Sequence, residues 1–327
     1  MNWQGKRVLV TGAGGFIGSH LTERLLALGA RTRALVHYRA DGTWGWLDDC
    51  KYKDEIDVLA GDIRDRDSVA KAMRGTEIVF HLAALIGIPY SYHVPLSYVC
   101  TNVEGTLNVL QTARDLAVER IVHTSTSEVY GSARYVPMGE MHPLQAQSPY
   151  AATKISADKL AESFFLSFGL PVVTVRPFNT YGPRQSARAI IPTIITQCLS
   201  GSSVCLGNVH PTRDLTYVTD VVEGFVLAAG SAEAIGCTIN IGSGNEISIK
   251  DLACLIGNLL DRTIVIQEEG ERVRPEKSEV ERLRADIRIA LQILGWKPSI
   301  SLEDGLRLTI GWLRGRLSGY RPRTYAL

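Results

Sequence analysis

Tyr150 and Lys154 are the side chains in this sequence with the clearest capacity for chemistry. They lie four residues apart, directly after Pro149, which can open a helix. On that helix they share a face. A free phenol has a pKa near ~10 and is a poor base at neutral pH unless a cation stabilises the phenolate. The pair therefore predicts a tyrosine that removes a proton beside the Lys154 ammonium.

A second reactive stretch runs from Thr124 through Thr126, Ser127 and Glu128 to Gly131, where a predicted strand ends. Glu128 offers a carboxylate for acid or base catalysis. The same residue could instead cap a helix or sit in a buried ion pair. This stretch and the tyrosine–lysine helix are the two candidate catalytic segments.

The first twenty residues predict a site for a dinucleotide. An apolar run, Lys6–Thr11, breaks into Gly12, Gly15 and Gly18, and then a helix follows. Backbone N–H groups and the positive end of such a helix attract a pyrophosphate. We expect Gly12 and Gly15 to let the pyrophosphate approach, and Gly18 to let the helix pack closely on the strand.

The rest of the N-terminal half alternates strands with helices, which predicts a Rossmann-type α/β fold with a doubly wound parallel sheet. Ligands of such sheets bind at the carboxyl ends of the strands, where every reactive residue above falls. The predicted strands after the first cover 31–37, 56–62, 77–83, 120–126 and 171–177, and the predicted helices cover 66–74, 95–117 and 150–168.

Past Pro177 the rhythm changes, which predicts a smaller, discontinuous C-terminal α/β substrate domain. Proline, glycine and arginine become frequent in 178–214, whereas 215–244 has a helix-like and a strand-like piece that could return to the sheet. We therefore assign 1–177 plus about 215–244 to the dinucleotide-binding domain. About 178–214 plus 245–327 form the second domain, with a cleft between the two.

Composition excludes several function classes. The 327 residues carry a net charge of +1 and are 45% hydrophobic, which is ordinary for a globular protein and gives no reason to expect nucleic acid or membrane as a partner. Six scattered cysteines without a CxxC pair predict no metal site and no disulfide framework. With no leader-like start, the chain is expected to be cytoplasmic.

The cofactor is predicted to be NADP or NAD, with NADP favoured. The second strand ends in His37, Tyr38 and Arg39, with no carboxylate before Asp41, and an arginine here suits the extra phosphate of NADP. Alternatively Arg39 is merely solvated and either cofactor binds. The remaining predicted cofactor contacts are Phe16, Ile17, Asp62, Ile63, Leu82, Ala83, Ala84, Thr124 and Pro177, together with Tyr150 and Lys154.

The motifs together resemble the extended short-chain dehydrogenase/reductases over essentially the whole chain. Within that family the chain is similar to the nucleotide-sugar 4,6-dehydratases. Segments 84–92 and 178–192, with Thr126-Ser127-Glu128, look most like the bacterial N-acetylglucosamine-nucleotide dehydratases of legionaminic-acid synthesis. The motifs that carry the likeness are Gly12-x-x-Gly15-x-x-Gly18, Tyr150-x-x-x-Lys154, Arg176-Pro177-Phe178-Asn179-x-Tyr181-Gly182-Pro183, Arg213-Asp214-x-x-x-Tyr217-Val218-x-Asp220 and Leu294-Gly295-Trp296-Lys297-Pro298.

The resemblance implies a reaction in three parts: oxidation at C4 of an NDP-hexose, elimination of water across C5 and C6, and return of the hydride to C6. Tyr150 would take the O4 proton, Thr126 would hydrogen-bond that oxygen, and Glu128 would remove the C5 proton. The dTDP-glucose members use an Asp-Glu pair, but here the Asp position is Ser127. This departure leaves Glu128 to serve as acid and base, or to use water.

The resemblance also supplies substrate and partner residues. A diphosphate calls for arginine forks and amide donors. Helices 95–117 and 150–168 match those that pair across a two-fold in this family, which implies a homodimer. The residues matching substrate-binding positions are Asn179, Arg188, Ile190, Arg213, Asn240 and Arg274, with Arg184 a further candidate.

Three other functions remain open from the sequence. A UDP-glucuronate decarboxylase shares the Thr-Ser-Glu triplet and also oxidises C4. An NDP-sugar C4 epimerase shares Tyr150 and Lys154 but does not need Glu128. A dinucleotide-sensing regulator could keep the fold without catalysis, because fold alone does not settle function.

Overall fold

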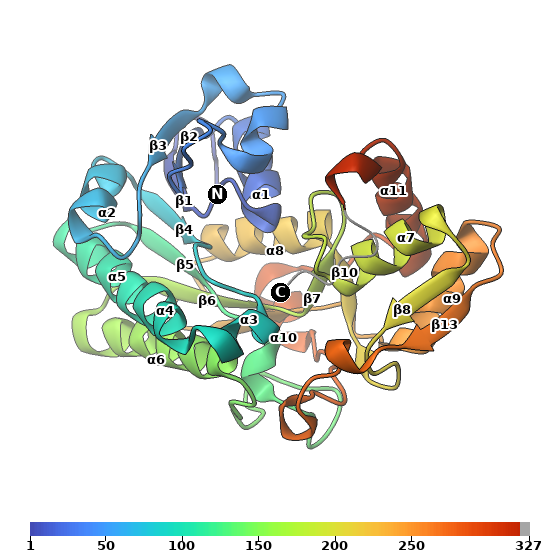
Figure 1. Ribbon diagram of the computed structural model, residues 1–327. Helices are drawn as coiled ribbons and strands as arrows, with labels where there is room; N and C mark the ends of the chain where they lie inside the picture. Colours follow the sequence, from blue (N-terminus) through green and yellow to red (C-terminus); the bar gives the residue numbers. More distant parts are fainter. Residues whose placement is uncertain (321–327) are drawn as a thin grey trace.

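A computed structural model describes residues 1–320. Its centre is a seven-stranded sheet in the order β11-β6-β5-β4-β1-β2-β3, and every neighbouring pair is parallel (Figure 1). This confirms the predicted doubly wound Rossmann-type sheet. The strands are β1 (Arg7–Thr11), β2 (Arg31–Val36), β3 (Asp57–Ala60), β4 (Ile78–His81), β5 (Arg120–Thr124), β6 (Val172–Pro177) and β11 (Thr238–Ile241).

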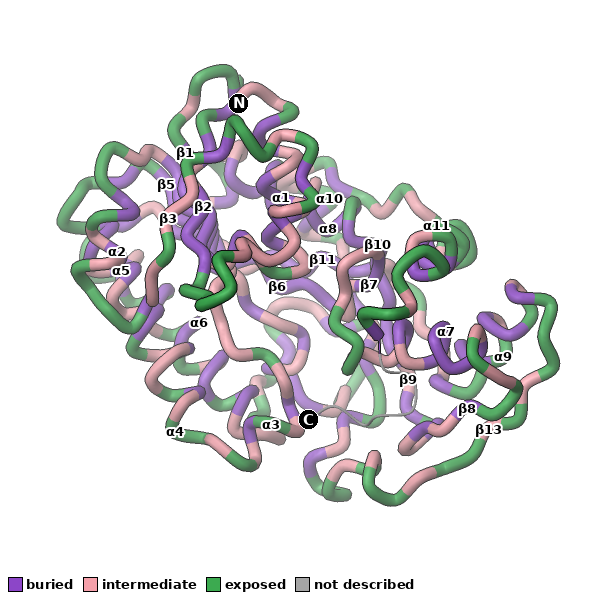
Figure 2. Tube along the Cα trace, turned by 45° about the horizontal axis from the view of Figure 1, so that its top comes forward, coloured by how far each residue is buried: buried purple, intermediate pink, exposed green. Residues whose placement is uncertain are grey.

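Helices cover both faces of this sheet because its central strands are apolar on both sides. Helices α1 (Phe16–Ala27) and α8 (Val218–Gly230) pack together on one face. Helices α2 (Arg66–Met73), α5 (Gly105–Asp115) and α6 (Pro149–Phe168) cover the other. Figure 2 shows the buried residues concentrated along the sheet between these two layers. Within 215–244, α8 packs on the sheet and β11 joins it, whereas residues 215–217 form a strand that pairs outside it.

The predicted helix over 95–117 is interrupted. It forms α4 (Pro95–Tyr98), a π-helical stretch η3 (Val99–Glu104) and α5. The wider π turn contains Asn102, which is 1% exposed and bonds both backbone groups of Leu85 and the hydroxyl of Thr153. Asn102 therefore fastens the chain leaving β4 to α6, and such π turns are frequent where function is built.

A second lobe carries the short sheets: β7 with β10, β9 with β12, and β8 with β13. The elements are β7 (Asn179–Tyr181), β8 (Ser203–Leu206), β9 (Thr212–Arg213), β10 (Leu215–Tyr217), β12 (Ile247–Ser248), β13 (Val265–Glu268), α7 (Ile190–Ser200), α9 (Ile249–Leu259), α10 (Arg288–Leu294) and α11 (Leu302–Arg314). Short elements elsewhere are α3 (Ile88–His93) and the 3₁₀ turns η1 (Gly45–Asp49), η2 (Lys53–Glu55), η4 (Ser127–Tyr130), η5 (Gly270–Arg272), η6 (Glu276–Ser278) and η7 (Leu317–Gly319).

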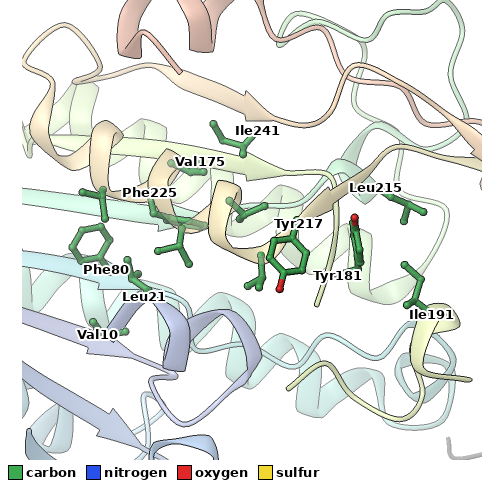
Figure 3. Close-up of a cluster of buried hydrophobic side chains, with 14 of the residues drawn as sticks. Val10, Leu21, Phe80, Val175, Tyr181, Ile191, Leu215, Tyr217, Phe225 and Ile241 are labelled. Carbon is green, nitrogen blue, oxygen red and sulfur yellow. The ribbon is translucent and has the colours of Figure 1, made fainter. Parts of the chain in front are cut away.

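One apolar core runs through both lobes. Figure 3 shows it passing from Val10 and Phe80 in the main sheet, past Phe225 on α8, to Tyr217 and Ile191. Helix α10 lies within the predicted second domain but packs against β11 and α8 of the main sheet. The predicted domain boundaries thus stay a prediction, and residues 321–327 of the second one lie outside the described part.

Candidate functional site

Tyr150 and Lys154 lie in the first two turns of α6, where they are 6% and 5% exposed. The helix begins as the sequence predicts, because Ser148 accepts a hydrogen bond from the Ala151 N–H at 3.1 Å and Pro149 occupies the first turn. The Nζ of Lys154 donates to the carbonyl oxygen of Thr124 at 2.6 Å. Helix α6 thereby fixes both groups at the end of β5.

Burial sets the electrostatics of this pair. It raises the pKa of Tyr150 above its ordinary value, and the nearby charge of Glu128 raises it further, whereas a hydrogen bond with Thr126 acts in the opposite direction. Burial lowers the pKa of Lys154 to about 8. Tyr150 is therefore protonated at neutral pH, and its use as a base requires additional positive charge beside it.

Glu128 reaches the same place from the turn after β5. The Thr126 hydroxyl accepts a hydrogen bond from the Glu128 N–H at 3.2 Å and caps η4. The half-buried carboxylate of Glu128 forms no hydrogen bond within residues 1–320, while its charge acts on Tyr150 and on Arg213. Ser127 is buried at the start of the turn. The structure therefore brings Tyr150, Lys154, Thr126, Ser127 and Glu128 into one cluster.

At Gly12 the structure shows a packing reason for a glycine that the sequence did not reveal. This residue has φ +71°, and a Cβ there would lie 2.8 Å from the Ala83 backbone nitrogen. Its backbone freedom thus accommodates the close approach of the chain leaving β4. The predicted approach of a pyrophosphate at Gly12 stays a prediction. At Gly18 a Cβ would collide with the carbonyl oxygen of Gly12, which confirms that this glycine lets α1 pack onto β1.

The N-terminal end of α1 fits the diphosphate of a dinucleotide. Its N-cap is the exposed Gly15, which provides no side-chain cap, and its first turn contains no acidic residue. A helix start of this kind leaves N–H donors and positive partial charge available to an anion. At the end of β5, the buried Thr124 hydroxyl has no hydrogen-bond partner within residues 1–320. These residues fit a nicotinamide dinucleotide, which supplies a hydride acceptor and donor when bound.

The other predicted cofactor residues lie along the carboxyl edge of the sheet. His37 and Arg39 are exposed past β2, and Arg39 donates to the Thr43 hydroxyl at 3.4 Å, while its charge also acts on Asp41. Asp62 is bonded by the Arg64 guanidinium at 2.6 Å, which lowers the pKa of its carboxyl. The rest occupy the start of α1 (Phe16, Ile17), the end of β3 (Ile63), the end of β4 (Leu82, Ala83, Ala84) and the end of β6 (Pro177).

The predicted substrate arginines fall into two places. Arg213 bonds Glu279 at 3.0 Å, and Arg274 lies 3.7 Å from the same carboxylate. Arg188 is exposed in the loop before α7. It lies in a different place, against Gly87 and Tyr98. Asn179 begins β7, and Ile190 begins α7.

Asn240 is placed differently from expectation. It is wholly buried, accepts from the Tyr130 hydroxyl at 2.8 Å and donates to the Met138 carbonyl at 3.0 Å. Both polar groups of its side chain are therefore engaged inside the protein. Its predicted contact with substrate stays a prediction, and its observed role is structural.

Sequence reasoning missed a set of hydrogen bonds that joins three separate segments of the chain. The Tyr92 hydroxyl and the Ser278 hydroxyl lie 2.6 Å apart, and Ser278 also donates to the Gln147 carbonyl at 2.5 Å. These residues come from the segment after β4, from η6 and from the approach to α6. Because they lie far apart in the chain, no spacing pattern could have found them.

A parallel α/β sheet with this tyrosine, lysine and glycine loop defines the class of extended short-chain dehydrogenases/reductases. Within it, the chain belongs to the GDP-mannose 4,6 dehydratase family, whose model matches residues 9–309. It is an enzyme of the nucleotide-sugar dehydratase/epimerase class. No helix in residues 1–320 is long and apolar enough to cross a membrane.

Relatives about equally similar to this chain carry names of three different reactions. A UDP-glucose 4-epimerase of Mycolicibacterium smegmatis is 33% identical, covering 95% of this chain and 99% of the relative. A UDP-N-acetyl-alpha-D-glucosaminuronate decarboxylase of Bacillus cytotoxicus is 32% identical, covering 94% of this chain and 98% of the relative. The structure of the dTDP-glucose 4,6-dehydratase DesIV of Streptomyces venezuelae, with NAD bound, superposes with a TM-score of 0.86 at 32% identity, covering 97% and 99%.

Replacement of Gly18 by alanine should destabilise the fold, because the added Cβ meets the Gly12 carbonyl oxygen and both are backbone-constrained. We expect the free energy of unfolding to fall by about 1–3 kcal/mol, measured by urea denaturation. Gly311→Ala is the matched control, since this exposed glycine of α11 has nothing within 4 Å of a Cβ. It should stabilise by about 0.5–1 kcal/mol, and equal effects of both changes would contradict the close packing at Gly18.

Proposed function

We propose that this protein is a nucleotide-sugar 4,6-dehydratase acting on an NDP-hexose, and specifically on NDP-N-acetylglucosamine. The observation that carries the proposal is the Glu128 carboxylate, without a hydrogen bond inside residues 1–320, beside Thr126 and Tyr150. An oxidation at C4 needs only the tyrosine and lysine. A carboxylate in the same cluster provides the base that removal of a C5 proton requires.

In this proposal each residue of the cluster has one task. The Tyr150 oxygen takes the proton from O4, and the buried Lys154 ammonium stabilises the resulting phenolate. The Thr126 hydroxyl, which lies near enough to lower the pKa of Tyr150, orients the same oxygen. Because Tyr150 and Lys154 are almost fully buried, water competes little for these protons.

Glu128 then carries out the elimination. A ketone at C4 makes the C5 proton acidic, and the Glu128 carboxylate removes it. The C5–H electrons form the C5–C6 double bond, the C6–O bond breaks, and the hydroxyl leaves as water after taking a proton. Because Ser127 occupies the position of a second acid, Glu128 itself or a water molecule supplies that proton. Hydride delivery to C6 and a proton at C5 complete the product.

The diphosphate is assigned to Arg213 and Arg274, which face each other across Glu279. Burial lowers the pKa of Arg213, and neighbouring carboxylates, Glu128 foremost, oppose that effect. A guanidinium held in this way is preorganised for a bidentate anion. Arg188, Asn179 and Ile190 complete the proposed substrate contacts.

A UDP-glucuronate decarboxylase is the second candidate, favoured by one observation. Arg188 lies against Tyr98, whose ring contacts that of Tyr150 edge-on at 6.3 Å. A cation so close to the reacting end of the sugar could pair with a carboxylate at C6. In that reaction the bond lost after C4 oxidation joins C5 to the carboxyl carbon, and Glu128 need not act as a base on C5.

The deciding experiment incubates the purified protein with a panel of UDP-, GDP- and dTDP-linked glucose, N-acetylglucosamine and glucuronate. Mass spectrometry then separates loss of water from loss of carbon dioxide, and chromatography detects a C4 epimer of unchanged mass. We expect loss of water from an N-acetylglucosamine nucleotide. Carbon dioxide release from a glucuronate, or only a C4 epimer, would replace the proposal by the corresponding alternative.

We further propose that NADP is preferred over NAD, because Arg39 is exposed past β2 without a carboxylate to pair with a ribose hydroxyl. Arg39→Gln should weaken NADP binding about tenfold through loss of one charge-assisted contact, while NAD binding stays unchanged. Arg31→Gln, at the opposite end of β2, is the control and should change neither affinity. Calorimetric titration measures both, and tighter NAD than NADP binding by the parent protein would contradict the preference.

A homodimer in the cytoplasm completes the proposal. Exposed apolar side chains occur on both helices that the sequence marks for pairing: Leu96 and Val99 around α4, and Leu166 and Phe168 at the C-terminal end of α6. Apolar side chains exposed on both helices are available for burial against a second copy. The scattered free cysteines agree with a reducing compartment.

A further inference from the structure

A buried ionic network lies directly beneath the tyrosine–lysine pair. Asp158 follows Lys154 by one turn of α6 and is 6% exposed. Its carboxylate is 3.0 Å from His123 Nε2, accepts from the Ser125 hydroxyl at 2.5 Å and pairs with the Arg176 guanidinium at 2.9 Å. The network therefore connects α6 to the central strands β5 and β6.

We propose that Asp158 is a positioning residue whose buried carboxylate acts as the counter-charge that keeps the Lys154 ammonium protonated and aimed at Tyr150. The proposal rests on the function above, in which Tyr150 and Lys154 act as a pair. Neither residue needs to touch Asp158, since unit charges one helical turn apart interact strongly in a protein interior.

The surroundings of Lys154 make a counter-charge necessary. Its ammonium is buried and donates to a neutral carbonyl, that of Thr124. Burial alone disfavours the charged form, and the charge of Asp158 opposes this and raises the pKa of Lys154. The positive charge of Arg176 in turn offsets part of the negative charge of Asp158. The electrostatic potential at Lys154 therefore depends on the balance of these two charges.

Among the titratable groups near the pair, Asp158 is the carboxylate whose charge raises the pKa of Lys154. Burial lowers the pKa values of both His81 and His123, so both are neutral at neutral pH. The remaining groups are phenols, Glu128 and the arginine of the network: Tyr98 from α4, Tyr130 and Glu128 from η4, and Arg176 from β6.

This arrangement predicts the sign of two substitutions. Asp158→Asn keeps the shape but leaves the Arg176 charge uncompensated, so the pKa values of Lys154 and Tyr150 should both fall. Arg176→Gln leaves Asp158 uncompensated, so both should rise. A residue with only a structural role would lower stability in both variants without opposite shifts.

The test measures the Lys154 ammonium directly by NMR titration of protein labelled with ¹³C at lysine Cε, with Lys154→Met identifying its signal. We expect the Lys154 pKa to fall by roughly one pH unit in Asp158→Asn and to rise in Arg176→Gln. Ser125→Ala is the matched control, because it removes a hydrogen bond from Asp158 without removing a charge, and it should leave the titration in place.

If one of the two variants does not fold, the other still tests the proposal, because the expected direction of the Lys154 pKa shift is defined for each variant separately. An unchanged Lys154 titration, or shifts in the same direction in both variants, would overturn it. The measurement needs no substrate, so it is separate from the test of the dehydratase function. With the substrate found there, both limbs of the pH–rate profile should move to lower pH in Asp158→Asn.

Discussion

Tyr150→Phe should lower kcat by about 10³–10⁴-fold, the contribution of a positioned general base. The change removes only the hydroxyl, so the packing of the ring against Tyr98 remains. Without the phenolic oxygen, the proposed acceptor of the O4 proton is lost: Thr126 is a neutral hydroxyl, Lys154 is a cation, and Glu128 is assigned to the C5 proton. Initial rates with the substrate found in the nucleotide-sugar panel measure the effect.

The comparison variant for this change is Tyr135→Phe, which removes a hydroxyl from a tyrosine that is 53% exposed. Its kcat should stay within a factor of two. Cofactor affinity of Tyr150→Phe, measured by calorimetry, should fall far less than its rate. A Tyr150→Phe enzyme that retained more than a tenth of the parent kcat would rule out the phenol as the base.

Glu128→Gln should abolish water loss while bound cofactor can still be reduced. The amide keeps the size of the side chain, and the cap formed by Thr126 uses the backbone N–H of residue 128, so η4 should persist. The amide cannot take the C5 proton, and we expect dehydration to slow by about 10³-fold or more. Single-turnover absorbance follows cofactor reduction, and mass spectrometry follows dehydration in the same sample.

Glu162→Gln provides the matched control, because Glu162 lies exposed on α6 and pairs with Lys159. It should leave both steps unchanged. An undiminished dehydration rate in Glu128→Gln would refute the assigned role. Loss of cofactor reduction as well as dehydration would instead place Glu128 in substrate binding, through its charge interaction with Arg213.

The two changes also separate the candidate reactions. A C4 epimerase depends on Tyr150 but not on a carboxylate at 128, so Glu128→Gln would leave it active. A decarboxylase loses the C5 substituent without deprotonation of C5, and the same variant would reduce its rate less. The relatives carry names from all three classes at similar identity, so chemistry at Glu128 discriminates better than similarity does.

Local patterns were sufficient for much of the fold. The parallel strands are buried on both faces and therefore appear as apolar runs, as in Val8, Leu9 and Val10 of β1. The start of α6 could also be predicted from the sequence, because Ser148 and Pro149 are local signals for a helix start. The boundaries of β3 and β4 came out shorter than predicted, since strand ends depend on the neighbouring strand.

The sequence by itself determined the sheet, the helix that carries Tyr150 and Lys154, and the turn that presents Glu128, because each depends on residues close together in the chain. Only the tertiary structure decided that Gly12 accommodates Ala83, that Asn102 in a π turn bonds Leu85, and that Asp158 meets His123 and Arg176. These contacts join residues from separate strands and helices. Their partners are fixed by how the sheet is wound and packed, which no spacing along the chain reveals.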